Sequence, residues 1–355
     1  MKTTNLGRSN PLVWVLSMTL AISLGLVINA QMRGNSTKPD KGKDLKAADY
    51  EISGPYTNKN LTVFLIHGPD KLPGKNFLTL QEALEQKKVI VFETKDVNEL
   101  AIQNLSKEEI YVQSGDIVKG GQQDRMLAVD LIVPAKSGKI PIDAFCVESG
   151  RWTKRGSEGA ATFASSAEAV ATKDLKLAAK VSKSQGAVWE NVTVAQDKLS
   201  ANVGARVNSP ASESSLQLAV ENTSVQQNVT SYTDELLKIV KSKSNVIGYV
   251  FAINGKVNSA DVYASNALFL KLWPKLLKAS SVEAIAEMQQ DAKFDALTKE
   301  QVKVFLAESE AGAASEKSVT ARVKLITREN KESVFFETLD GAESVWVHRN
   351  YIKKN

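Results

Sequence analysis

Two clusters of polar residues and glycines stand on either side of a short hydrophobic passage. The first is GDIVKGGQQDRMLAVD, residues 115–130, and the second is CVESGRW, residues 146–152. Carboxylates, guanidinium groups and a tryptophan at this spacing can bind anions, transfer protons or stack on rings. The same composition also suits an elaborate turn at the end of a β-hairpin. The residues with candidate roles are Gly120, Gly121, Gln123, Asp124, Arg125, Glu148, Arg151 and Trp152.

Two apolar strands are predicted between these clusters, over residues 126–133 and 140–147, and they flank the loop sequence PAKSGK. Symmetric pairing about that loop makes one face of the hairpin entirely apolar, which favours this register. The register is predicted to within about two residues. The opposite pairs that this register gives outside the loop are Leu127 with Cys146, Arg125 with Glu148, and Gln122 with Arg151. The two polar clusters are therefore expected to meet at the mouth of one hairpin.

The hairpin mouth has a functional and a structural interpretation. In the functional one, Arg125 or Arg151 binds a carboxylate or phosphate through parallel guanidinium donors. Glu148 then orients the guanidinium or acts as a general base, and Asp124 serves as acid or base. In the structural one, Arg125 and Glu148 form a partly buried ion pair, and Asp124 caps a turn.

The glycines and the tryptophan leave the same choice open. Gly120 and Gly121 could form a backbone nest for an anion, with Gln123 in the polar run that follows. The order of residues differs from a phosphate-binding P-loop, which needs Lys and then Ser or Thr after its last glycine. Alternatively, the glycine pair forms a bulge or turn before the strand. Trp152 could stack on a ligand ring or close the end of the core.

The counts of cysteine and histidine argue against several kinds of site. Cys146 is the only cysteine, so no internal disulfide can form, and its apolar neighbours indicate a core position. The only histidines are His67 and His348, which are too few for the usual zinc sites and leave little room for histidine-dependent triads. Asp130 and Asp143, expected opposite each other in the hairpin, make a poor cage for calcium or magnesium. We predict neither a metal nor a cofactor.

The first thirty residues have the pattern of a secretory signal peptide. Lys2 and Arg8 precede an apolar run over residues 12–28, and Ala30 marks a plausible cleavage point. The length of the run leaves a retained N-terminal membrane anchor as the alternative. Residues 31–49 then form a polar, flexible tether. We expect an extracytoplasmic protein, periplasmic or secreted, that contacts the membrane only if the N-terminal segment is retained.

The charge of the chain argues against a nucleic acid partner. The formal net charge is +5, and residues 1–30 hold two positive and no negative side chains, so 5 − 2 leaves +3 for the rest. Such a charge is too small to bind a phosphate backbone by itself. The sequence also has no basic arm with interleaved aromatic residues.

The remaining elements predict an α+β fold, because strands and helices occur without a regular βαβ alternation. We expect antiparallel hairpins and several packed helices, followed by a small β-rich segment over residues 316–353. Thr79 and Glu82 have the spacing of a helix capping box, and Asn254-Gly255 is a strong signal for a hairpin turn.

Other segments carry weaker signals. Residues 153–173, rich in Gly, Ala and Ser, are expected to be a mobile flap or a weak helix, and residues 202–230 a loop-rich connector. Helices are expected from Ser184 and, with Ser231 as N-cap, through residues 232–243. A further helix over residues 267–288 is expected to kink or break at Pro274.

The paired motifs resemble the core signature of the ADP-ribosylglycohydrolase- and rhodanese-phosphatase-superfamily-associated domain. They are GGQQDR at residues 120–125 and CVESGRW at residues 146–152. The segments FLTLQEAL, AVW, VIGYVFAINGKV and LFLKLW fit the same pattern. The resemblance covers residues 50–288, and we place the α+β domain at residues 50–300. It implies an association with proteins that handle ADP-ribose and phosphorylated compounds, and it names no reaction.

The sequence thus predicts an exported domain that binds an anionic small molecule at the hairpin mouth, such as a nucleotide, an ADP-ribose-like compound or a sugar phosphate. Glu148 and Asp124 would be the catalytic residues if hydrolysis occurs, and the sequence does not decide whether it does. The alternative is a non-catalytic extracytoplasmic module, structural or protein-binding, in which the same residues hold the end of the sheet.

Overall fold

The computed structural model describes residues 46–94, 96–241, 243–290 and 292–354. Residues 43–355 group into one compact unit. The predicted signal segment 1–30 and most of the tether 31–49 lie outside the described residues. The end of the tether is a short 3-10 turn, Ala47–Asp49, in which Ala47 is buried.

The larger sheet is antiparallel and has eight strands. In spatial order these are β1 (Glu51–Asn58), β2 (Leu61–His67), β12 (Val246–Ile253), β13 (Lys256–Tyr263), β17 (Val345–Lys353), β16 (Ser333–Asp340), β15 (Val323–Glu329) and β14 (Ala313–Ser318). The predicted hairpin at Asn254-Gly255 is confirmed: both residues have positive φ, 54° and 73°, as a type I′ turn requires. The β-rich segment predicted at 316–353 is β14 to β17, which continues this same sheet.

The second sheet has six strands and carries the polar clusters. Its spatial order is β11 (Phe163–Val170), β7 (Asp116–Gly120), β8 (Arg125–Leu127), β10 (Ile140–Cys146), β5 (Glu99–Asn104) and β4 (Val89–Glu93). A third, three-stranded sheet consists of β3 (Leu78–Thr79), β6 (Ile110–Val112) and β9 (Leu131–Val133). The strands pair antiparallel apart from β3 with β6, so the predicted α+β class is confirmed.

The predicted hairpin between the polar clusters is only partly correct. Its first strand divides in two: β8 pairs with β10, whereas β9 leaves that sheet and pairs with β6. Leu127 lies opposite Ala144 instead of Cys146, a shift of two residues from the symmetric register. The division occurs at Asp130, whose carboxylate is buried because Ser114 and His348 bind it. The predicted pairing of Asp130 with Asp143 is therefore wrong.

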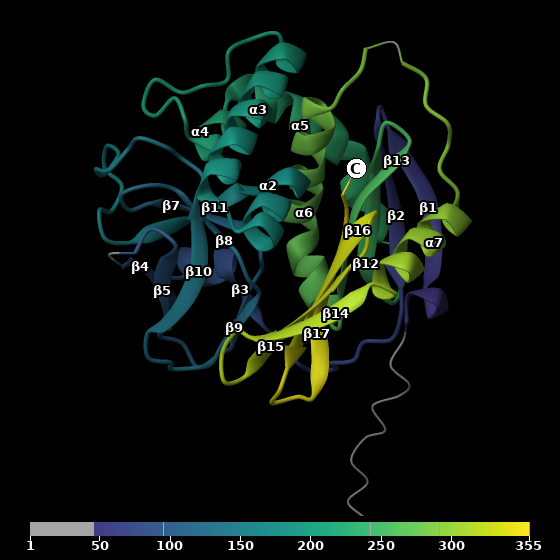
Figure 1. Cartoon of the computed structure of the whole chain (residues 1–355), viewed down its shortest axis with the longest axis horizontal. Helices are drawn as coiled ribbons and strands as arrows, with labels where there is room; N and C mark the ends of the chain where they lie inside the picture. Colours follow the sequence, from purple (N-terminus) through teal and green to yellow (C-terminus); the bar gives the residue numbers. More distant parts are fainter. Residues whose placement is uncertain (1–45, 95, 242, 291, 355) are drawn as a thin grey trace, which may run out of the picture. The chain divides into compact units, whose positions relative to one another are not determined.

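Helices cover and separate the two large sheets. They are α1 (Leu80–Glu85), α2 (Lys173–Leu177) with the π-helical turn η2 (Ala178–Ser182), α3 (Gln185–Val203), α4 (Leu216–Val220), α5 (Thr223–Leu236) with the 3-10 turn η3 (Leu237–Val240), α6 (Asn266–Ala286) and α7 (Lys299–Glu310). Figure 1 shows α6 between the sheet that contains β12 and the sheet that contains β11. Both faces of α6 are therefore apolar, and most of its residues are buried.

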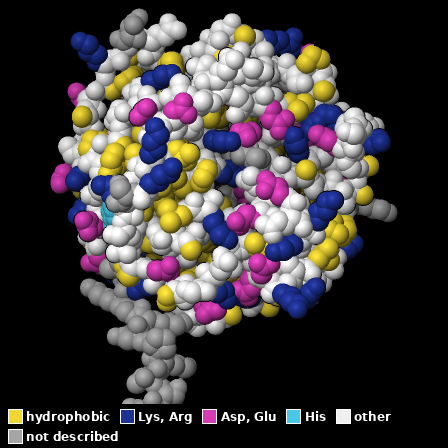
Figure 2. Space-filling model, turned by 180° about the vertical axis from the view of Figure 1, so that it is seen from behind, with side chains coloured by type: hydrophobic (Ala, Val, Ile, Leu, Met, Phe, Trp, Pro, Cys, Tyr) yellow, Lys and Arg dark blue, Asp and Glu magenta, His cyan; other side chains and the backbone are white. Residues whose placement is uncertain are grey.

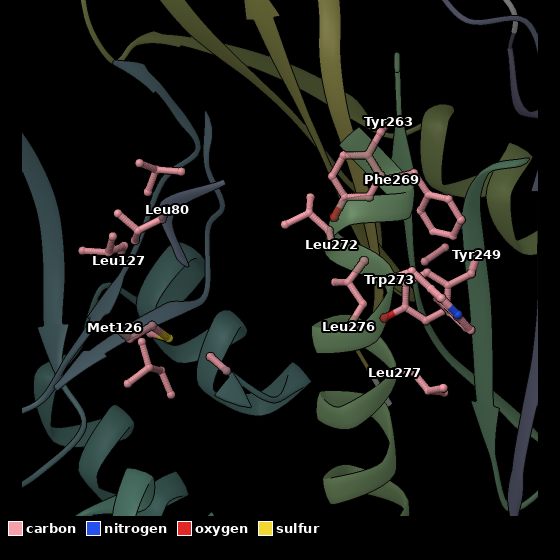
Figure 3. Packing of buried hydrophobic residues seen from close by; sticks show 14 of the residues in the cluster. Leu80, Met126, Leu127, Tyr249, Tyr263, Phe269, Leu272, Trp273, Leu276 and Leu277 are labelled. Carbon is pink, nitrogen blue, oxygen red and sulfur yellow. The ribbon is translucent and has the colours of Figure 1, made fainter. Parts of the chain in front are cut away.

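The packing around α6 is dominated by aromatic rings on one side and aliphatic chains on the other. Trp273 meets Tyr249 of β12 edge to face, with ring centroids 5.4 Å apart. Leu272 and Leu276 point away from these rings, toward the side of the core that holds Met126 (Figure 3). One hydrophobic cluster therefore links the two sheets through this helix.

Several helix predictions are confirmed and others are wrong. The capping box at Thr79 and Glu82 is present, and Ser184 caps α3. The residues predicted as a flap include β11, because an edge of the six-stranded sheet offers backbone partners that the sequence does not reveal. Ser231 lies inside α5, which begins after Asn222, so it is not an N-cap.

The connector predicted at 202–230 contains α4 and the first half of α5, so its description as loop-rich is wrong in that part. Its serines and asparagines act as caps: Ser215 begins α4 and Asn222 begins α5. Helix α6 runs without a break through Pro274. Among the helices of the described residues, none combines the length and apolar character needed to cross a bilayer. On the face shown in Figure 2, basic and acidic side chains are interspersed.

Candidate functional site

The glycine pair forms a tight turn between β7 and β8. Gly120 and Gly121 have φ of 118° and 53°. A Cβ on Gly121 would lie 2.5 Å from both the Phe163 ring and Glu93 Oε1, so only glycine fits. The Gly120 N–H donates to the Asp124 carboxylate, and the Gly121 N–H donates to the Gly159 carbonyl. Both N–H groups are therefore used within the protein, and they do not form an open anion nest.

Asp124 is the centre of a buried ionic network. Its side chain has no exposed surface, and Arg155 binds it with both terminal nitrogens at 3.0 Å. Ser215, the N-cap of α4, donates to the same carboxylate at 2.8 Å. The network thus ties the turn before β8 to the start of a helix about ninety residues further along the chain.

Glu148 is the second buried carboxylate of this network. Arg151 grips it side-on, with Nε at 2.6 Å from Oε1 and Nη2 at 2.7 Å from Oε2. The backbone N–H of Asp124 donates to it at 2.9 Å, and Arg155 lies 3.3 Å away. The two predicted clusters therefore do meet in space, and Asp124, Glu148 and Arg151 are brought together.

All five N–H donors of each arginine are used within the protein. Those of Arg151 bind Glu148 twice and three backbone carbonyls, Gly120, Gly121 and Thr153. Those of Arg155 bind Asp124, Glu148 and Glu158. A guanidinium has five donors and no acceptor, so neither arginine keeps a donor for a ligand.

Burial raises the pKa of both carboxylates, but the net shifts of the two pKa values have opposite directions. Burial raises the pKa of Asp124, and the neighbouring charge of Glu148 adds to the rise although Arg155 opposes it. Burial acts in the same direction on Glu148, but the hydrogen bonds from Arg151 and the Asp124 backbone outweigh it, so the pKa of Glu148 is lowered. Glu148 is thus held as a weakly basic anion, whereas an efficient general base near neutral pH has a pKa close to that pH.

Arg125 and Gln123 are buried but lie outside this network. The predicted contact between Arg125 and Glu148 is wrong, because the shift in register places Arg125 opposite Cys146. Its guanidinium donates to the Gln123 carbonyl and lies 3.6 Å from Glu93. Arg125 Nε and both polar atoms of the Gln123 side chain have no partner among the described residues. Trp152 is 52% exposed, so it does not close the core.

Sequence reasoning missed Arg155, which completes the network. It lies in the segment 153–173 that was predicted as a flap, where no hydrophobic periodicity indicated a fixed position. Its spacing of three residues from Glu158 is the only local signal, and this pair is present at 3.0 Å.

A separate cavity of about 430 Å³ opens where β10 and η2 face strands β14 to β16. In Figure 1 β16 lies to the right of α2, β14 and β15 lie below it, and β10 lies to its left. Apolar side chains line part of its wall, namely Val129, Phe145, Leu325 and Phe336. The charged residues on the wall are Lys180, Lys183, Lys317, Asp143 and Glu316. An apolar pocket of this size with a few charged groups has the character of a small-molecule site.

The charges on this wall do not balance. Asp143 is paired with Lys317 at 3.0 Å, and Glu316 is paired with Lys324 at 2.9 Å. Lys180 and Lys183 have no carboxylate within ion-pair distance among the described residues. The cavity therefore carries an excess of positive charge that an anionic ligand could neutralise.

Lys180 has an unusual environment. Its Nζ lies 3.7 Å from the centroid of the Phe336 ring. It forms no hydrogen bond with a described residue. Burial lowers the pKa of Lys180, and Lys176 acts in the same direction while Asp130 and Asp261 oppose it, to give about 8. A substantial fraction of this amine is neutral near pH 8.

Behind Lys180 lies a buried histidine held by two carboxylates. His348 contacts Asp130 at 2.9 Å through Nδ1 and Asp261 at 3.0 Å through Nε2, and its ring stacks on Tyr263. Burial opposes protonation, but the two carboxylates outweigh it and raise the pKa of His348. Burial likewise opposes ionisation of Asp130 and Asp261, yet the surrounding cations lower the pKa of both.

Within the parts of the chain that the structure describes, no group of three or more His, Cys, Asp or Glu side chains is placed to hold a metal ion. Cys146 is buried, and burial raises the pKa of its thiol, as expected for a core cysteine.

Comparison with known proteins gives one family and no close relative. No curated protein and no solved structure shows significant similarity to the chain. Residues 49–352 match the ARG and Rhodanese-Phosphatase-superfamily-associated Protein domain. The match includes both polar motifs, both large sheets and the C-terminal strands, so it extends beyond the resemblance at residues 50–288. The chain belongs to this family.

Proposed function

We propose that this domain binds an anionic small molecule in the cavity between β10, η2 and β14–β16. The observation that carries the proposal is the charge imbalance: each carboxylate on the wall has a lysine partner, whereas Lys180 and Lys183 have none. The apolar wall formed by Phe145 and Phe336 favours a ligand with a ring or hydrocarbon part as well as its negative group.

The hairpin mouth supports a different role. Because every donor of Arg151 and Arg155 binds the protein, this network leaves no guanidinium donor to recognise a phosphate or carboxylate. We propose that its residues hold the turn before β8 against α4 and the segment 148–158. Asp124, Glu148 and Arg151 thus have a structural role. The proposed anion site is the lysine-lined cavity instead of the hairpin mouth.

The binding proposal is tested by thermal unfolding of the purified protein with a panel of anions: inorganic phosphate, AMP, ADP-ribose, glucose 6-phosphate and pyridoxine 5′-phosphate. A ligand present at one hundred times its Kd adds about 2.7 kcal/mol to the free energy of unfolding. We expect at least one aromatic anion to raise the Tm of the wild type, and Lys180→Met and Lys183→Met to reduce that rise.

The matched control is Lys256→Met, which removes an exposed lysine that is not on the cavity wall. A general effect of net charge would lower the response of all three variants equally. A panel without any response, or a response that Lys180→Met and Lys183→Met leave intact, would refute the cavity as the anion site.

We propose further that the chain is exported. The support is the sequence pattern of residues 1–30: a basic start, an apolar run and a small residue at Ala30. Cell fractionation with N-terminal sequencing of the protein tests this. A mature protein that begins near Gln31 in an extracytoplasmic fraction is expected, and a full-length protein confined to the cytoplasm would contradict it.

A further inference from the structure

We propose that Lys180 is a nucleophilic amine that forms an imine with a carbonyl group of the ligand bound in this cavity. This inference rests on the proposed function, because it names the substrate class of the same site: small anions that carry an aldehyde or ketone. It assigns Lys180 a covalent role that electrostatic binding alone does not require.

The position of the amine is the first support. Lys180 lines the cavity, and Phe336 covers one side of its Nζ at 3.7 Å from the ring centroid. No described residue accepts a hydrogen bond from this nitrogen, in contrast to Lys275, whose Nζ is bound to Asp116 at 2.7 Å. An amine that is engaged by a carboxylate must break that contact before it attacks a carbonyl, and Lys180 has no such contact to break.

The surrounding charges are the second support. Three cationic groups, Lys176, Lys180 and His348, share the field of two buried carboxylates, Asp130 and Asp261. His348 occupies both carboxylates through its two ring nitrogens. Burial is the main cause of the lowered pKa of Lys180, about 8, and the opposing charges of Asp130 and Asp261 do not offset it.

Two lysines of this helical segment, Lys180 and Lys183, lie on the cavity wall. Lys176 and Lys180 are four residues apart, on consecutive turns of α2 and η2, and Lys176 is buried. Ala179 beside Lys180 is also buried, whereas Lys183 after η2 is exposed at the cavity rim. The inner lysine is thus suited to reaction and the outer lysine to attraction of the negative group.

The covalent step balances without any further reagent. The neutral Nζ donates its lone pair to the carbonyl carbon, and a proton moves from nitrogen to the former carbonyl oxygen to give a carbinolamine. The C–O bond then breaks, one proton from solvent leaves with the hydroxyl as water, and the nitrogen lone pair forms the C=N bond of a protonated imine. The new cation remains beside the ligand's own negative charge, which stabilises it.

The test uses two matched probes. Pyridoxal 5′-phosphate is an aromatic aldehyde with a phosphate group, and pyridoxine 5′-phosphate has an alcohol in place of that aldehyde. The protein is incubated with each probe, reduced with sodium borohydride, and analysed by intact mass and peptide mapping. We expect one adduct per chain with the aldehyde, located on Lys180, and none with the alcohol.

Variants then separate reaction from binding. Lys180→Arg keeps the positive charge but cannot form an imine, so it should lose the adduct while the alcohol probe still raises its Tm. Lys256→Arg, an exposed control, should keep the adduct on Lys180. The rate of adduct formation in the wild type should rise with pH to a half-maximum near 8, well below the pKa of an ordinary lysine.

The outcomes distinguish this inference from the binding proposal. An alcohol probe that raises the Tm, combined with no adduct on Lys180, overturns the imine and leaves anion binding in place. Adducts on Lys183 or spread over exposed lysines also overturn it. If neither probe changes the Tm and no adduct forms on Lys180, two statements are refuted: that Lys180 forms an imine, and that the cavity binds anions of the pyridoxal type.

Discussion

The structural role of the hairpin mouth gives the sharpest prediction, which concerns Glu148→Gln. The substitution keeps the shape of the side chain but replaces an anion with a neutral amide, one end of which donates hydrogen bonds. Glu148 has no exposed surface and accepts from Arg151 at 2.6 and 2.7 Å, so the amide would direct N–H groups at a guanidinium. We expect a loss of about 3–5 kcal/mol in the free energy of unfolding, the usual cost of breaking a buried ion pair from one side.

The matched control is Glu213→Gln. Glu213 also pairs with an arginine, Arg206, at 3.1 Å, but both side chains are about two thirds exposed, at 68% and 67%. The same chemical change should cost only about 0–1 kcal/mol there. Urea unfolding of the three proteins, fitted with a common m-value, measures the difference. A loss of less than about 1 kcal/mol in the free energy of unfolding of Glu148→Gln would refute the reasoning, because removing one partner of a buried ion pair costs several times more.

The pH dependence of the same variant supplies a second measurement. The pKa of Glu148 is lowered in the folded protein, so its ionised form contributes stability above the ordinary value of 4.5. That contribution is lost as the pH falls through the lowered folded value. The gap between wild type and Glu148→Gln should therefore narrow below pH 4.5. The raised pKa of Asp124 has the opposite sign, so it partly offsets the acid destabilisation of the wild type.

Two further substitutions test the buried histidine and the glycine turn. Because the pKa of His348 is raised in the folded protein, its protonated ring contributes fully to stability below pH 6.5, and this contribution is lost as the pH rises through the pKa of the folded state. Urea titrations should therefore show a difference in stability between wild type and His348→Asn that shrinks at alkaline pH. A difference that widens there would contradict a protonated His348. Gly121→Ala places a Cβ 2.5 Å from the Phe163 ring at a residue with a φ of 53°, and it should lower the free energy of unfolding by about 1–3 kcal/mol. Gly138→Ala has open space around its Cβ and should change the melting midpoint little. Equal effects of the two substitutions on the melting midpoint would contradict the steric argument.

Local signals in the sequence predicted a good part of the fold. The capping box at Thr79 and the Asn254-Gly255 turn act over a few residues, and both are found as expected. The meeting of the two polar clusters was also predictable, because strands 126–133 and 140–147 are close in sequence and their apolar faces must align. A register error of two residues is enough, however, to put Cys146 instead of Glu148 opposite Arg125.

The remainder depends on contacts between distant parts of the chain. Strand β9 leaves its neighbour because β6, about twenty residues upstream, offers the edge that it completes. Arg155 binds Asp124 from 31 residues further along the chain, and it lies just before β11, whose pairing with β7 is itself a contact between distant segments. The cavity combines residues from Asn98 to Phe336, and no spacing within one segment shows that Lys180 will face a phenylalanine of β16.

The two polar regions are linked through β10, and this link decides how the experiments must be combined. Gln185 lies on the cavity wall, and its side-chain amide binds the backbone N–H and carbonyl of Cys146, two residues before Glu148. A variant that loosens the ionic network can therefore also displace one wall of the cavity, and weaker binding by Glu148→Gln would not place a ligand at the hairpin mouth. Lys180→Met has no such ambiguity, because it removes the amine without breaking an ion pair. Binding that is lost in Lys180→Met at unchanged stability, and stability that is lost in Glu148→Gln without ligand, would together assign recognition to the cavity and support to the network.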